Sequence, residues 1–345
     1  MKKHLFQFIF FALIIISILA LSSCSPENCN HEFIDNNCIF CRVTSDSCFE
    51  FILIDNDTYA VKASKYGIYS MPSKVKIPDS YNDKPVTAIA NMAFSKCETI
   101  EKIVLPQTVT YLSGSCFSSC TNLKEITIPS SVTYIGPFTF SNCSSLKRIS
   151  IPKSVETIEM CAFDGCESLT TIRLPNSVTG LGDAAFRNCT GLESVIIGNG
   201  ISEIGTYAFT DCTSLTTVKL GKNVDTIGSA AFSGCSSLKQ ISLPKTVTKI
   251  KGSAFYNCSS LEEIELPSGL NSIGDHAFSG CVELKTIIIP KSIVSIGDKA
   301  FEKCYKLNKA YYEGSESDWK NVILWSSDVG LTEYEIEFNY KKYFK

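Results

Sequence analysis

Two pairs of metal-binding residue types lie close together near the start of the chain. Cys29 and His31 form a C-x-H pair, and Cys38 and Cys41 follow as a C-x-x-C pair. Thiolates and imidazoles are the ligands of tetrahedral zinc, and a C-x-x-C turn presents two sulfurs to one ion. The spacing predicts a structural zinc site. Disulfides among Cys29, Cys38, Cys41 and Cys48 are an equal alternative in an exported chain, and unpaired thiols are a third.

The chain offers little for catalysis. Its three histidines are His4, His31 and His276, and none has a nucleophile and an orienting group in the text around it. We therefore expect a non-enzymatic protein with no cofactor apart from the structural zinc. A hydrolase that uses one of the cysteines is the enzymatic alternative, and it would need an accessible thiol. The formal net charge of −3 gives no indication of nucleic-acid binding.

The first residues have the layout of a secretory signal. Two lysines precede an apolar run over residues 5–21, and small residues follow. The tetrapeptide LSSC that ends at Cys24 resembles the bacterial lipobox, which implies cleavage after residue 23 and a lipid on the sulfur of Cys24. We expect a signal peptide over residues 1–23 and a mature protein at the cell surface or outer membrane, held there by the lipid alone. An uncleaved anchor is the alternative, because the apolar run could cross a bilayer.

A period of 23 residues dominates the rest of the chain. Each copy reads approximately L-x-x-I-x-L-P-x-x-V-x-x-I-G-x-x-A-F-x-x-C. The two most regular columns are the phenylalanines Phe94, Phe117, Phe140, Phe163, Phe186, Phe209, Phe232, Phe255, Phe278 and Phe301, and the cysteines Cys97, Cys120, Cys143, Cys166, Cys189, Cys212, Cys235, Cys258, Cys281 and Cys304. We interpret these cysteines as small buried residues that bond weakly to a turn, because free cysteine is among the most buried residue types.

The repeat must be read as one coil of a stack. In L-x-x-I-x-L the fourth and sixth residues share one face of a strand, and the proline that follows ends it. One coil buries apolar groups worth roughly 10–20 kcal/mol. Ordering its backbone costs at least as much, so a single coil cannot fold alone. Stacked coils share one core, and this requires a constant length because like residues must meet.

These elements predict a β-rich solenoid, of the α+β class, with about ten coils over residues 75–308. A small Cys/His-rich segment is expected over residues 24–48, and a β-hairpin over 49–74 covers the first edge. A C-terminal cap is expected over 309–345, with a short helix that starts near Ser315 or Ser317 and a strand in EYEIEFNYKKYF. Trp319 and Trp325 are predicted to be capping side chains.

The repeat resembles the leucine-rich repeats of the BspA type, also described from treponemes. The resemblance covers about two thirds of the chain, and YYEGSESDWKNV looks like the closing segment of that family. It implies a right-handed, curved solenoid and, for some members, attachment to host or bacterial surfaces. The partners it implies are proteins of the host surface or of other bacteria. Oligomeric state is not indicated.

A partner would bind the outward positions of the strands, on the surface expected to be concave. Their charges form a basic region in the centre and an acidic coil near the end, and a solvated charged face is the plainer interpretation. No aromatic platform for sugars is visible there, so a protein ligand is favoured over a glycan. The main hypothesis is protein binding or cell adhesion, and the alternative is a structural envelope component without a specific ligand. The candidate binding residues are Lys147, Arg148, Arg173, Lys219, Glu262, Glu263 and Glu265.

Overall fold

A computed structural model describes residues 33–34, 37–38, 48–54, 57–65, 67–325, 331 and 336–341. The predicted signal peptide, Cys24, Cys29, His31 and Cys41 lie outside these residues. Cys38 is described by its backbone alone, in β2 (Asn37–Cys38), which pairs antiparallel with β1 (Phe33–Ile34). The zinc, disulfide and lipid predictions therefore remain predictions. Cys48, the fourth candidate for a disulfide, is buried in the core at the start of the solenoid.

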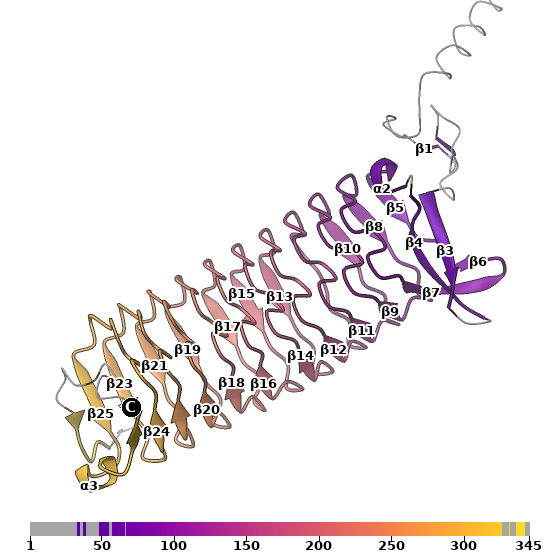
Figure 1. Cartoon of the computed structure of the whole chain (residues 1–345). Helices are drawn as coiled ribbons and strands as arrows, with labels where there is room; N and C mark the ends of the chain where they lie inside the picture. Colours follow the sequence, from indigo (N-terminus) through magenta and orange to yellow (C-terminus); the bar gives the residue numbers. More distant parts are fainter. Residues whose placement is uncertain are drawn as a thin grey trace, which may run out of the picture.

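The chain forms a parallel β-solenoid of about twelve coils. Figure 1 shows the coils side by side along one axis, with the indigo N-terminal coils at one end and the yellow C-terminal coils at the other. Strand partners are 23 residues apart, as in the pairing of Ile126 with Ile103. The predicted solenoid is confirmed, and its repeat length is confirmed by this register.

One side of every coil, which we call the strand face, carries the L-x-x-I-x-L segment. Its strands form three parallel sheets, in the orders β10-β8-β5, β13-β15-β17-β19-β21 and β23-β25-β27. In the coil between β10 and β13, only a single bridge between Glu125 and Arg148 is formed. The strands are β5 (Lys74–Lys76), β8 (Lys102–Val104), β10 (Glu125–Thr127), β13 (Thr171–Arg173), β15 (Ser194–Ile196), β17 (Thr217–Lys219), β19 (Gln240–Ser242), β21 (Glu263–Glu265), β23 (Thr286–Ile289), β25 (Lys309–Tyr312) and β27 (Ile336–Glu337).

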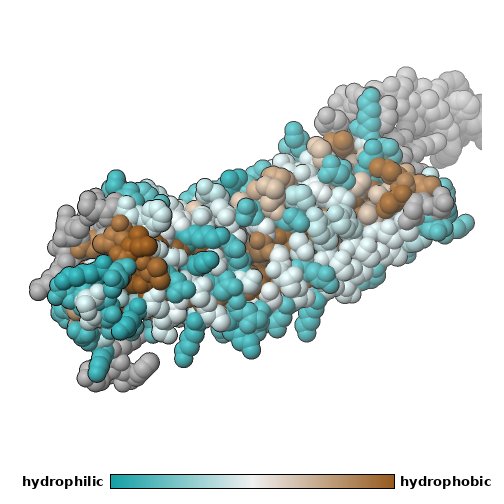
Figure 2. Space-filling model, turned by 60° about the horizontal axis from the view of Figure 1, so that its bottom comes forward, coloured by the Kyte–Doolittle hydropathy of each residue, from teal (hydrophilic) through white to brown (hydrophobic). Residues whose placement is uncertain are grey.

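A second side carries the V-x-x-I segment in short strands, and Figure 2 shows its apolar surface gathered mainly near the two ends of the array. The ladder is interrupted once, between β14 and β16. Its strands are β3 (Phe49–Leu53), β4 (Tyr59–Ala63), β7 (Lys84–Ile89), β9 (Tyr111–Leu112), β11 (Tyr134–Ile135), β12 (Thr157–Ile158), β14 (Gly180–Leu181), β16 (Glu203–Ile204), β18 (Thr226–Ile227), β20 (Lys249–Ile250), β22 (Ser272–Ile273), β24 (Ser295–Ile296) and β26 (Ile323–Leu324), with β6 (Ser80–Tyr81) paired to β7.

The third side, the turn side, carries the A-F-x-x-C segment and has no strands. Its main chain is held by the following coil: the amide N–H of Phe117 donates to the carbonyl of Thr139 at 2.9 Å, and that of Ser119 donates to the carbonyl of Ser141 at 2.7 Å. In each of the ten copies the residues two before and two after the phenylalanine have positive φ, as Ser115 (φ 55) and Ser119 (φ 59) do. Most of these residues are not glycine, so the bonds to the next coil offset a backbone strain that the sequence does not reveal.

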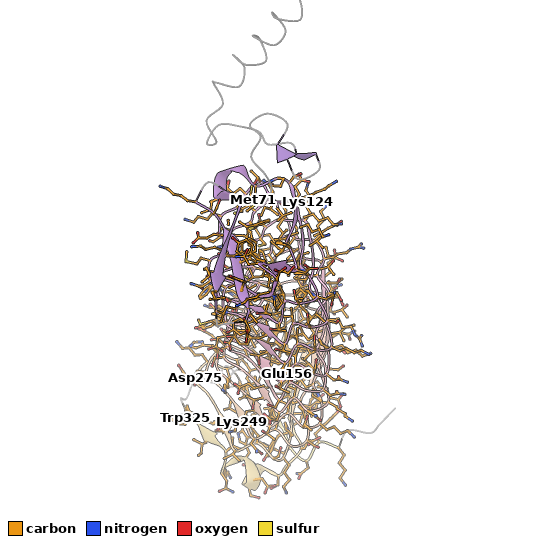
Figure 3. The ribbon with its side chains drawn as sticks, turned by 90° about the vertical axis from the view of Figure 1, so that its right-hand side faces the viewer. Met71, Lys124, Glu156, Lys249, Asp275 and Trp325 are labelled. Atoms are coloured by element: carbon orange, nitrogen blue, oxygen red, sulfur yellow. The ribbon has the colours of Figure 1, made fainter. Side chains whose placement is uncertain are left out.

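The core runs through all the coils without a break. Every phenylalanine of the column is at most 1 % exposed, and Figure 3, which looks along the stack, shows side chains filling its interior. Cys120 donates its thiol to the carbonyl of Phe94 at 3.1 Å, and eight later cysteines repeat this bond at 3.1 to 3.3 Å. The prediction of buried cysteines that bond to a turn is therefore confirmed.

Both ends of the solenoid are modified coils. The predicted N-terminal hairpin is confirmed as β3 and β4, and β4 pairs in parallel with β7, while α2 (Gly67–Ser70) follows. At the other end α3 (Glu316–Trp319) begins after Ser315, whose hydroxyl accepts the amide of Asp318 at 3.1 Å. This confirms the first of the two predicted starts.

Two expectations for the C-terminal end need correction. The repeat geometry does not stop at residue 308, because β25 pairs in register with β23 and β26 pairs with β24. Lost proline and leucine signals do not abolish a coil when the preceding coil supplies a template. Trp319 packs edge-on against Tyr312 at 5.0 Å and acts as a cap. Trp325 is 72 % exposed, so its predicted capping role is wrong.

Candidate protein-binding face

The outward residues of the strand face point to solvent as the alternation predicts. In β8, β10, β13, β19 and β21 the middle residue is buried and its two neighbours are exposed. The reason is elementary, because successive side chains of a strand point to opposite faces and the apolar fourth residue fills the core. A partner that lies on this face would touch polar side chains almost exclusively.

Near both ends of the strand face, charged side chains are paired between neighbouring coils. At the N-terminal end Lys102 lies 2.7 Å from Glu125, and Lys124 lies 3.1 Å from Glu101. Each such pair joins exposed groups and stabilises the fold by at most about 1 kcal/mol. At the C-terminal end the pairs are Lys285–Glu262 at 2.6 Å, Lys306–Glu283 at 2.7 Å and Lys309–Glu337 at 3.5 Å.

The centre of the face differs from its ends. The four predicted basic residues Lys147, Arg148, Arg173 and Lys219 are all exposed, and none forms an ion pair within the described part of the chain. We call these four residues the basic tract. Their neighbours on the strands are largely threonine and serine, which carry no charge to neutralise them. The tract therefore keeps a positive potential that the paired ends lack.

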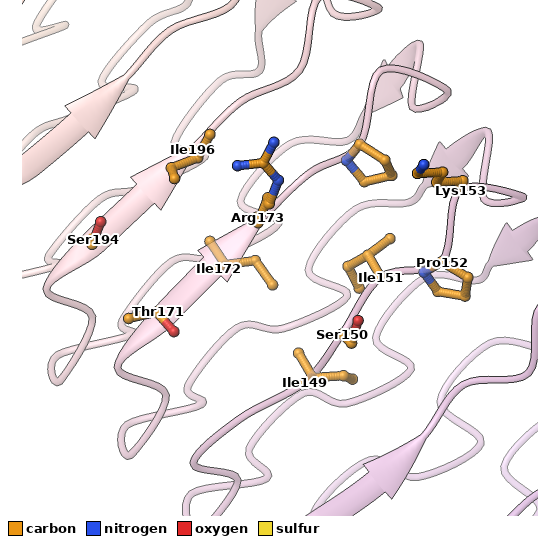
Figure 4. A pocket seen from close by; sticks show the side chains of 11 residues that line it. Ile149, Ser150, Ile151, Pro152, Lys153, Thr171, Ile172, Arg173, Ser194 and Ile196 are labelled. Atoms are coloured by element: carbon orange, nitrogen blue, oxygen red, sulfur yellow. The ribbon is translucent and has the colours of Figure 1, made fainter.

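A groove lies beside the basic tract where the ladder of strands is interrupted. It has a volume of about 550 Å³ and lies between residues 149–153 and β13, with Ser194 and Ile196 at its far side. Figure 4 shows Ile149, Ser150 and Ile151 facing Thr171, Ile172 and Arg173 across it. β13 has a strand partner on one side only, β15, so its other edge borders the groove.

The predicted acidic residues occupy a different place. Glu262 is bonded to Lys285, which lowers the pKa of that carboxyl. Glu263 and Glu265 line a second groove of about 890 Å³, at the interruption between β21 and β23, together with Lys285 and C-terminal Lys341. Acidic and basic groups are therefore mixed there. The structure separates the predicted binding residues into two locations and does not bring them into one site.

The described residues offer no arrangement for catalysis by a thiol. All thirteen cysteines with described side chains are buried. Burial raises the pKa of Cys143 and of Cys258 to about 12, so these thiols are not nucleophiles at neutral pH. Among the described side chains, no group of three or more histidines, cysteines or carboxylates is placed to hold a metal ion.

One polar cluster was missed by the sequence analysis. His276 Nδ1 lies 4.0 Å from Glu302 Oε2, and the hydroxyl of Ser279 donates to the same oxygen at 3.4 Å. Ser279 is 1 % exposed and bonds to the carboxylate and not to the imidazole, so the cluster does not activate a nucleophile. The 23-residue step from Ser279 to Glu302 could have revealed the contact.

A second missed feature is a tyrosine pair. The rings of Tyr111 and Tyr134, at equivalent positions of β9 and β11, stack at 4.5 Å with their planes 7° apart. Tyr111 is 43 % exposed, so the pair presents its edges to solvent. The same 23-residue step gives the signal in the sequence, but stacking of exposed rings follows only once the coils are in register.

Comparison with protein families decides which repeat this is. The family described as "BspA type Leucine rich repeat region (6 copies)" matches residues 68–193 and 181–308, more than half of the chain. The chain belongs to the BspA-type leucine-rich repeat family. A BspA-type array of this kind is a protein-interaction repeat, and surface proteins of this type are extracellular or attached to the cell surface. Across the described ranges, no helix is long and apolar enough to span a bilayer.

Solved structures similar to this BspA-type protein are bacterial. A leucine-rich cell surface protein of Faecalibacterium prausnitzii is 25 % identical over 81 % of this chain and 97 % of its own, with a TM-score of 0.48. A leucine-rich repeat protein of Bacteroides ovatus is 22 % identical over 84 % and 98 %, with a TM-score of 0.46. The pneumococcal vaccine antigen PcpA is 20 % identical over 86 % and 97 %, with a TM-score of 0.44. A search of curated proteins gives no match.

Proposed function

We propose that this protein is a non-enzymatic, lipid-anchored adhesin that binds proteins of host surfaces or of neighbouring bacteria through its strand face. The observation that carries the proposal is the basic tract. Its four cations have no ionic partner among the described residues, whereas charges towards both ends are paired between coils. A face whose only task is to be soluble has no need of an unneutralised centre beside a groove.

The anchor in this proposal is a lipid on Cys24. It rests on the LSSC tetrapeptide after the apolar run. Cells that express the full chain and are fed a labelled fatty acid should label the wild-type protein and not the Cys24→Ser variant. A wild-type protein that stays unlabelled would remove the lipid from the proposal. Native mass spectrometry of the same preparation would also report whether Cys29, His31, Cys38 and Cys41 carry zinc or disulfides.

Binding is tested with the purified full chain on intact host epithelial cells and on bacterial cells. We expect saturable binding to at least one of them, and loss of binding when the target cells are treated with protease beforehand. Binding that resists protease but is lost after glycosidase treatment would mean that the ligand is a glycan. If no cell binds the chain saturably, the structural alternative replaces the adhesin.

A further inference from the structure

The groove next to β13 differs from the second groove in the sign of its charges. Its charged lining residues are Lys153 and Arg173, both basic, and Arg148 precedes it on the same segment. The second groove is lined by three glutamates and three lysines, which neutralise one another. Only the first groove therefore has a rim of one sign, and it favours an anionic partner.

The floor and walls of this groove are apolar. Ile149 and Ile196 are partly exposed, while Ile151 and Ile172 are buried beneath them, and two prolines complete the lining. Its volume of about 550 Å³ is that of an ordinary binding pocket. No aromatic ring is among these lining residues, so the groove offers no platform on which a sugar or a base would stack. An aliphatic side chain fits it better than either.

We propose, building on the proposed protein-binding function, that this groove takes an apolar side chain of an extended acidic polypeptide segment. Carboxylates on either side of that side chain lie against Arg148 and Arg173. The guanidinium group accepts carboxylates in a bidentate manner, and here it does so without first giving up a partner within the protein. The open edge of β13 runs alongside and offers main-chain groups to an extended segment.

The groove is tested with defined probes on the full chain. The first probe is a labelled ten-residue peptide of alternating glutamate and leucine, and the second replaces each leucine by serine at the same charge. We expect the leucine peptide to bind at least about tenfold more tightly in fluorescence anisotropy, a difference of about 1.4 kcal/mol. Equal affinities, or no binding of the leucine peptide up to about 1 mM, would overturn the proposal.

The role of the cations is separated from general charge by a matched control. Arg148→Glu/Arg173→Glu should weaken binding of the leucine peptide at least about tenfold. Lys74→Glu/Lys76→Glu makes the same charge change on β5, at the equivalent exposed strand positions, where no groove lies. It should weaken binding less than about threefold, since it changes only long-range attraction. Equal losses in the two variants would reduce the site to unspecific attraction of anions.

A further pair of variants fills the groove while leaving every charge in place. Ser150→Tyr places a ring at a lining position, and Thr127→Tyr places one at the equivalent exposed position of β10. We expect only Ser150→Tyr to abolish the preference for the leucine peptide over the serine peptide. A preference that survives in Ser150→Tyr, or a sulfated oligosaccharide that binds more tightly than the leucine peptide, contradicts the proposal. The cell-binding assay is separate, so the groove can fail while the adhesin function stands.

Discussion

The rings of Phe163 and Phe186 lie with their centroids 5.0 Å apart and their planes 1° from parallel, although 23 residues separate them. The same relationship continues from Phe94 to Phe301, with centroid separations of up to 5.6 Å. Each inner ring is therefore covered on both sides by an identical ring. Because no coil can bury its phenylalanine alone, the interaction that forms the core is also the one that fixes the repeat length.

The phenylalanine column should contribute strongly to stability. Phe186→Ala removes a fully buried ring from between two others and should lower the free energy of unfolding by about 3–5 kcal/mol. The change is measured as a shift of the urea midpoint followed by circular dichroism. Phe138→Ala is the matched control, because Phe138 is 38 % exposed and lies outside the column. Equal shifts in the two variants would contradict a continuous core.

The thiol column should make the protein sensitive to alkaline pH. Burial raises the pKa of Cys97, Cys143 and Cys304 to about 12 from an ordinary value of 9.0. Above pH 9 the unfolded chain loses these protons while the folded chain keeps them, so the stability falls as the pH rises from about 9 towards 12. Below pH 9 both states hold the protons and the contribution is constant.

Urea midpoints at pH 7, 8.5 and 10 under reducing conditions measure this effect. We expect little change between the first two values and a clear decrease at the third. Cys143→Ala should reduce the decrease, by up to about 1.4 kcal/mol per pH unit. An unchanged slope in this variant would mean that the thiol column is not its cause. Alkylation of the cysteines from Cys97 to Cys304 at neutral pH should also require unfolding.

The ion pair between Asp164 and Arg187 should be worth more than the pairs on the strand face. Arg187 donates to both carboxylate oxygens at 3.1 and 2.9 Å, and Asp164 is only 7 % exposed. Arg187→Met leaves the carboxylate without its main partner and should cost about 1–3 kcal/mol in unfolding free energy. Lys102→Met breaks an exposed pair and should cost less than about 1 kcal/mol. A larger loss for Lys102→Met would reverse this ranking.

Two glycines that lie two residues apart should respond in opposite ways to alanine. A Cβ at Gly182 would come within 2.3 Å of the amide nitrogen of Met160, so Gly182→Ala must push neighbouring coils apart and should cost about 2 kcal/mol or more. A Cβ at Gly180 meets only the side chain of Thr157, at an ordinary 3.4 Å. Gly180→Ala should therefore be neutral or stabilise by up to about 1 kcal/mol. Thermal melting of the two variants decides, and a tolerated Gly182→Ala would mean that the coils can spread.

The sequence alone determined the solenoid, its period and the direction of its side chains. Phe186 and Phe209 repeat at a constant interval, and alternation along each strand places Ile126 inside and Glu125 outside, so no tertiary information was needed for these. Likewise, the start of α3 at Ser315 followed from local capping chemistry.

Only the tertiary structure decided where the face can bind a partner. Lys102 and Arg148 look alike in the sequence, but Glu125 lies 2.7 Å from the first, and the second has no ionic partner in the described chain. The coil at Ile149–Ile151 carries the same residue pattern as its neighbours, yet the groove opens there. The positive φ of Phe138 and the continuation of the ladder through β25 were also hidden. Each depends on how one coil sits against the next, and the repeat motif is almost the same in every coil.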